Sequence, residues 1–98
     1  MTVSILGTKY KIIFEDFGNH STRDAYCDPV NKEIHISNQY GEEYTKHSIR
    51  HEITHAFFFE SGLEKYFNDE DIVSYISLQF DKIQKAFEEA ENGRNKKN

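Results

Sequence analysis

Residues 48–58 carry the sequence SIRHEITHAFF, and the other segments of the chain are arranged around this stretch. The pattern H-E-x-x-H, formed by His51, Glu52 and His55, lies at its centre. Four apolar residues recur at the spacing of one helix face: Ile49, Ile53, Ala56 and Phe57. The stretch therefore predicts an amphipathic helix that buries one face and turns the two histidines into a cleft on the adjacent face.

The spacing of the two histidines indicates a metal site. On a helix, residues four apart lie on one face about 6 Å from each other, so the imidazoles of His51 and His55 can bind one zinc ion. Glu52 lies about 100° round the helix and can reach a water bound to that ion. Zinc lowers the pKa of its water to about 7, and a nearby carboxylate can then take the proton. We therefore predict Zn²⁺ as the cofactor, His51 and His55 as metal ligands, and Glu52 as the general base. The alternative is a pair of solvated histidines on an amphipathic helix.

A catalytic zinc site needs a third protein ligand. His47 continues the spacing of four, but it lies about 12 Å along the helix axis from His55, too far for both to bind one ion. We expect the third ligand at the start of a second helix, where Glu70 and Asp71 are the main candidates and Asp69 is a weaker one. Acidic residues are also favoured in a first helical turn because they complement the helix dipole. The residues alone leave this choice open.

The segments before the motif predict a small sheet. Residues 3–17 form a hairpin pattern and residues 33–37 a strand with Ile34 and Ile36 on one face, while residues 25–27 are a candidate for a further short strand. Residues 15–24 are polar and predict a loop. Because the connections are too short for crossovers, we expect an antiparallel sheet of about three strands.

Two helices are predicted after the sheet. The motif helix spans residues 42–60, with Gly62 as its C-terminal cap. Asn68 is the predicted N-cap of a second helix over residues 69–91, which Gly93 ends. This helix has an apolar stripe that we expect to be buried: Ile72, Val73, Ile76, Phe80, Ile83, Phe87 and Ala90. The expected fold is therefore α+β, a single domain over residues 1–92 with a polar, frayed tail at 93–98.

Composition narrows the class of protein. The 98 residues have a formal net charge of -5, which disfavours binding to nucleic acid through phosphates. A single cysteine, Cys27, excludes an internal disulfide, suits a reducing cytoplasm and is interpreted as a small buried hydrophobic residue. No apolar run is long enough to span a membrane, and the N-terminus lacks the pattern of a signal peptide. We expect a cytoplasmic protein.

Four pieces of the chain between about Val3 and Phe87 form a recognisable series. They are Ile5-Leu6-Gly7 with Tyr10, Cys27-Asp28 before Ile34-His35-Ile36, residues 49–56, and Glu70-Asp71-Ile72-Val73. In order and spacing this series resembles the small zincin-like metallopeptidase domains of phages and prophages, which are related to the gluzincins and the ImmA/IrrE-type metallopeptidases. The resemblance implies a minimal zincin-like fold, a zinc cofactor, hydrolysis of peptide bonds, and Glu70 as the acidic ligand.

The chain departs from the gluzincin pattern at Ser74. That pattern often has an acidic residue four positions after the glutamate ligand, where it orients a ligating histidine. Some other carboxylate or carbonyl group would have to do this here.

Two functions follow from these observations. The first is a zinc-dependent peptidase that acts on an unknown intracellular protein, with an exposed sheet edge able to take an extended peptide. The second is a non-catalytic, zinc-stabilised protein-binding module. Glu52 separates the two, because a structural zinc site needs no general base. Four tyrosines could donate a hydrogen bond to the oxyanion, and the residues alone do not choose among them: Tyr40, Tyr44, Tyr66 and Tyr75.

Overall fold

The computed structural model describes residues 1–18 and 23–96 and has an α+β fold, as the sequence predicts. The predicted loop at 15–24 therefore lies partly outside the described residues. The elements in chain order are β1 (Thr2–Ile5), β2 (Thr8–Glu15), β3 (Ala25–Asp28), β4 (Glu33–Ser37), α1 (Glu42–Glu60), α2 (Glu64–Phe67) and α3 (Glu70–Lys96). The sheet has four strands, one more than expected. No helix among the described residues is both long and apolar enough to cross a bilayer.

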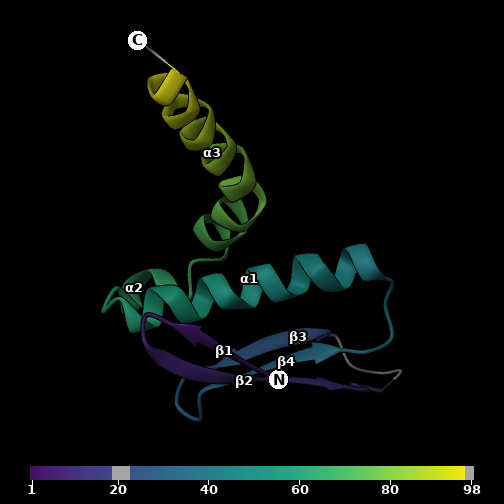
Figure 1. Ribbon diagram of the computed structural model, residues 1–98. Coiled ribbons are helices and arrows are strands. Elements are labelled where there is room, and N and C mark those ends of the chain that lie inside the picture. Colours follow the sequence, from purple (N-terminus) through teal and green to yellow (C-terminus); the bar gives the residue numbers. More distant parts are fainter. Residues whose placement is uncertain (19–22, 97–98) are drawn as a thin grey trace.

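The strand order is β1-β2-β4-β3, which places β1 and β3 at the two edges (Figure 1). β1 pairs with β2 and β3 pairs with β4 in antiparallel fashion, but β2 and β4 are parallel. The expectation of a wholly antiparallel sheet is therefore wrong. The chain leaves β2, forms β3 at the far edge, and returns as β4 between them. Residues 16–32, with β3 among them, are thus the crossover, and they are long enough for a parallel connection.

One face of the sheet packs against α1 and forms the core. The buried members are Ile5, Tyr10, Ile12, Ile34, Ile36 and, from α1, Ala56. Ile49 and Ile53 of α1 pack against this cluster, in agreement with the predicted apolar face. The sequence pattern predicts Phe57 on that face as well, but Phe57 is 48% exposed. α1 therefore lies across the sheet, and a second face of this helix, which carries the histidines, is not covered by the sheet.

The motif helix begins and ends where the sequence predicts. α1 spans Glu42–Glu60, and Gly62 follows with a φ of 76°, the left-handed conformation that glycine adopts without strain. The N–H groups of Gly62 and Leu63 donate to the carbonyl oxygens of Phe59 and Phe58. These bonds satisfy the last carbonyls of the helix and turn the chain back toward α2.

The start of α3 differs by one residue from the prediction. The carboxylate of Asp69 accepts a hydrogen bond of 3.1 Å from the N–H of Ile72, so Asp69 is the cap rather than Asn68. α3 then continues through Gly93 to Lys96. The predicted helix end near Gly93 is therefore wrong, while the fraying expected for residues 93–98 stays a prediction and residues 97–98 lie outside the described residues. One helical glycine costs only about 1 kcal/mol, which a long helix tolerates.

α3 projects away from the rest of the molecule, as Figure 1 shows, and the structure is elongated, with extents of 60 × 31 × 27 Å. Only the first turns of α3 pack against α1. Of the predicted buried stripe, Val73 is fully buried and Ile72 is half-buried, but Ile76, Phe80, Ile83, Phe87 and Ala90 are exposed. That prediction is therefore wrong beyond the first turns. The pattern identifies the apolar face of a helix, but it contains no information about what covers that face.

Candidate metal centre

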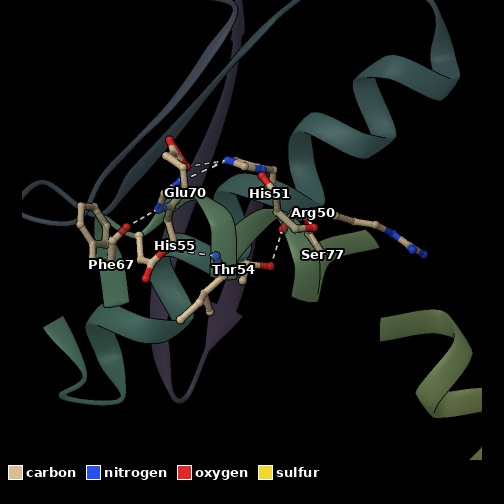
Figure 2. A network of polar contacts seen from close by, with 10 residues as sticks. Arg50, His51, Thr54, His55, Phe67, Glu70 and Ser77 are labelled. Atoms are coloured by element: carbon tan, nitrogen blue, oxygen red, sulfur yellow. Dashed lines mark hydrogen bonds and ion pairs between the residues drawn. The ribbon is translucent and has the colours of Figure 1, made fainter. Parts of the chain in front are cut away.

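The structure brings together the three residues that the sequence singled out as metal ligands. His51 and His55 lie on successive turns of α1, and Glu70 is the first residue of α3 (Figure 2). The Oε1 atom of Glu70 lies 3.0 Å from Nε2 of His51 and 2.8 Å from Nε2 of His55. The two Nε2 atoms are 3.2 Å apart. These three side chains are a group that could hold a metal ion.

The tautomer of His55 follows from its second contact. Its Nδ1 atom lies 2.5 Å from the backbone carbonyl oxygen of Phe67, which can only accept a hydrogen bond. Nδ1 therefore carries the proton, and a neutral His55 presents the lone pair of Nε2 toward His51 and Glu70. The carbonyl of Phe67 thus orients this histidine.

The separations among the three atoms fit a metal ion. Nitrogen and oxygen ligands bind zinc at about 2.0–2.2 Å, so two tetrahedral ligands lie roughly 3.3 Å from each other. The distance between the two Nε2 atoms, 3.2 Å, is close to this value, and the two distances to Glu70 are slightly shorter. Without a cation or an added proton, a carboxylate oxygen and two imidazole lone pairs would repel one another. The donor set is therefore one that a divalent cation satisfies.

The preceding turn determines which acidic residue faces the histidines. The ring of Phe67 in α2 packs against two rings of α1, and its centroid lies 5.4 Å from that of His55 and 5.9 Å from that of Phe59. This contact holds the end of α2 against α1. Asp69 then caps α3, and Glu70 is the next residue along the chain. Among the described residues, neither Asp69 nor Asp71 belongs to the metal-binding group.

His47 also lies outside this group within the described part of the chain, as its distance along the helix predicts. Its ring centroid is 6.3 Å from that of His51. His47 nevertheless lines the same cavity as the three candidate ligands. It is therefore placed to contact a bound molecule rather than the metal.

Glu52 is buried beside the candidate ligands, with only 7% of its surface exposed. Burial raises the pKa of its carboxyl group to about 7; the nearby His55 lowers that pKa and the negative charge of Glu70 raises it. A carboxyl group with a pKa near neutrality can exchange a proton with water at physiological pH. Glu52 lines the same cavity as His51, His55 and Glu70. The position predicted for a general base is thus close to the predicted metal.

The cavity has a volume of about 470 Å³ and lies between α1, the start of α3 and the edge strand β3. Ala25, Tyr26 and Cys27 of β3 line its outer wall. β4 is the only strand that pairs with β3 within residues 1–18 and 23–96. The other edge of β3 therefore borders the cavity, with backbone groups available to a further strand.

The structure also chooses among the four candidate tyrosines and adds Asp24, which the sequence did not single out. The hydroxyl of Tyr44 in α1 donates a hydrogen bond to the carboxylate of Asp24, which raises the pKa of Tyr44 to about 12. Both residues line the cavity, so Tyr44 is the one of the four tyrosines that does. Tyr44 and Asp24 are twenty residues apart, and no local pattern signals that they meet.

Cys27 packs against the core, as predicted, although it is only partly buried. Burial, followed by the charge of Glu52, raises the pKa of its thiol to about 12. Cys27 is therefore a thiol at neutral pH, and it is outside the metal-binding group of the described residues.

Comparison of the chain with protein-family models, with curated proteins and with solved structures finds no match. The interpretation of this site therefore rests on its own residues and their geometry.

Proposed function

We propose that this protein binds one Zn²⁺ ion through His51, His55 and Glu70 and hydrolyses peptide bonds. The observation that carries the proposal is the convergence of these three side chains beside a buried carboxyl group, Glu52, in one cavity. A structural zinc site is usually closed by four protein ligands, whereas a catalytic site has three and an open position. The described residues supply three.

Glu52 is the proposed general base. It would accept a proton from the attacking water and later pass it to the leaving nitrogen, the two transfers that peptide hydrolysis requires. The pKa of Glu52 is about 7 without a metal ion, and a bound cation would lower this pKa and favour the carboxylate form that accepts a proton. When bound, the metal ion would act as a Lewis acid toward the water and the carbonyl oxygen. His55 would keep its orientation through the bond from Nδ1 to the carbonyl of Phe67.

The proposed substrate is an extended segment of a protein. An extended peptide can add to the free edge of β3 through backbone hydrogen bonds, which would lay it along the cavity wall. The ring of His47 and the hydroxyl of Tyr44 line the same cavity and are candidates to contact the peptide carbonyl, for which Tyr44 would have to release its hydrogen bond to Asp24.

A zinc-stabilised binding module is the second candidate, and one observation favours it. The three candidate ligands join α1 to the first turn of α3, whose only fully buried apolar residue in the described part of the helix is Val73. A metal ion there would hold α3 in place even without catalysis. In that case Glu52 would have no chemical role.

The Glu52→Gln variant distinguishes the two functions. Removing a positioned base typically lowers the rate about 10²–10⁴-fold, so Glu52→Gln should bind zinc but lose cleavage of fluorescently labelled casein. Glu43→Gln, a change on the exposed first turn of α1, is the matched control and should retain activity. A wild-type protein that holds one zinc and does not cleave the casein would favour the binding module. Cleavage that survives Glu52→Gln would exclude Glu52 as the base.

A further inference from the structure

Apolar residues recur along α3 at alternating intervals of three and four. They are Val73, Ile76, Phe80, Ile83, Phe87 and Ala90. The average interval is close to 3.5 residues, which is the repeat of a left-handed coiled coil rather than the 3.6 of a helix packed on a curved core. α3 thus carries the sequence pattern of a helix that pairs lengthwise with another helix.

In the structure most of this apolar stripe, which we call the seam, has no partner among the described residues. Ile76, Phe80, Ile83 and Phe87 are 36%, 55%, 47% and 64% exposed. With roughly 200 Å² for each large side chain, these four present roughly 400 Å² of apolar surface in one contiguous strip. That is as large as the largest apolar patch of a typical monomer, and such patches mark interaction sites.

Beyond Val73, which is buried, the seam is clear of the contact between α3 and α1. Ser77 is buried, and Asp81 accepts a hydrogen bond of 2.6 Å from Arg50 of α1, so these residues mark the side that faces α1. At 100° per residue the centre of the seam lies about 110° round the helix from that side. α3 projects away from the sheet, which leaves room beside it (Figure 1).

We propose that this seam binds the α3 helix of a second copy of the same chain, in antiparallel orientation. Ile76 then lies opposite Phe87 of the second copy, and Phe80 lies opposite Ile83 of the second copy. Every exposed layer pairs one aromatic ring with one isoleucine, so no layer sets two rings against each other. Both copies use the same surface, and each contact occurs twice across a two-fold axis, as a symmetric dimer requires.

The positions that flank the seam favour an identical partner. Between Ile76 and Phe87 they are Ser77, Gln79, Gln84 and Ala86, and none is charged. Charged residues at these positions set partner choice through attraction or repulsion between the two helices. None of these four residues would repel the same residues of a second copy. Pairing the two seams removes roughly 800 Å² of apolar surface from water. The flanking side chains add to this buried area and bring it toward roughly 1,200 Å², the lower limit for specific protein interfaces.

The test is the oligomeric state of the full chain in solution, measured by sedimentation equilibrium. We expect the wild-type chain to be a dimer at roughly 100 µM. Phe80→Glu should raise the dissociation constant of this dimer at least a hundredfold, because each dimer contains the substitution in both helices. Leu78→Glu is the matched control, since Leu78 is also 55% exposed on α3 but lies outside the seam. Its dissociation constant should change less than about threefold. Circular dichroism checks that both variants fold, and Phe87→Glu replaces Phe80→Glu if the latter does not.

Two results would refute dimerisation through the seam. One is a wild-type chain that is monomeric at that concentration, and the other is a dimer that Leu78→Glu weakens as much as Phe80→Glu. Orientation is tested separately in a Cys27→Ala background with a short bismaleimide cross-linker. The antiparallel pairing brings Gln79 close to Ala86 of the second copy. In a mixture of Gln79→Cys and Ala86→Cys chains, the cross-linked products should therefore be mainly dimers that contain one chain of each kind. Cross-linked products with no excess of mixed dimers would refute that orientation. The inference does not depend on the proposed peptidase function.

Discussion

The proposed role of Glu70 as a metal ligand can be tested through thermal stability. Glu70→Gln keeps the size of the side chain but removes its negative charge. In the structure one oxygen of Glu70 lies within 3.0 Å of both histidine nitrogens, so this change removes one of the three proposed ligands. Outer-sphere changes at metal sites typically cost 10–100-fold in affinity, and losing a ligand should cost at least the upper value.

This loss converts into a stability difference. At a zinc concentration 100 times the wild-type dissociation constant, binding stabilises the folded chain by about 2.7 kcal/mol. A hundredfold weaker site would lose most of that amount, which corresponds to roughly 10–20 °C in Tm for a domain of this size. Without zinc the change should be small, because the Glu70 side chain is 67% exposed and such contacts contribute about 0–1 kcal/mol.

The assay compares thermal melts with zinc and with a chelator for wild type, Glu70→Gln and Asp71→Asn. Asp71 is also acidic and exposed in the first turn of α3, so Asp71→Asn controls for the helix dipole. We expect wild type and Asp71→Asn to gain the full Tm increase with zinc and Glu70→Gln to gain little. An equal gain for Glu70→Gln would refute the assignment of Glu70. A gain lost only in Asp71→Asn would place the ligand one residue later.

Two further predictions concern parts of the fold away from the metal. Burial lowers the pKa of His35, but hydrogen bonds to Glu15 (2.5 Å) and Glu33 (2.9 Å) outweigh it and raise that pKa above its ordinary value of 6.5. The contribution of protonated His35 to the free energy of unfolding should therefore be fully present below pH 6.5 and be lost as the pH rises through the higher folded-state pKa. Urea titrations at several pH values should show this loss in wild type. The same loss in a His35→Gln variant would contradict the prediction. Val73→Ala removes two buried methyl groups from the contact between α3 and α1 and should lower the free energy of unfolding by about 2 kcal/mol in urea; a loss below about 0.5 kcal/mol would mean that this contact contributes little.

Local features of the fold follow from the sequence because short-range physics determines them. The bounds of α1, Glu42–Glu60, are predictable from apolar periodicity and from Gly62, which ends the helix in a left-handed conformation. The convergence of His51 and His55 follows from helix geometry alone, since residues four apart share a face. The exclusion of His47 from the metal-binding group follows from the rise per residue.

Other features depend on contacts between distant segments, and only the tertiary structure decides them. The parallel pairing of β2 with β4 arises because β3 occupies the far edge, which no pattern within a single strand encodes. The choice of Glu70 over its neighbours depends on the docking of Phe67 and on Asp69 as the cap, since a shift of one residue turns a helical side chain by about 100°. The apolar stripe of α3 is evident in the sequence, but its exposure is not. Periodicity reports which residues share a face, whereas burial depends on whether another surface reaches that face.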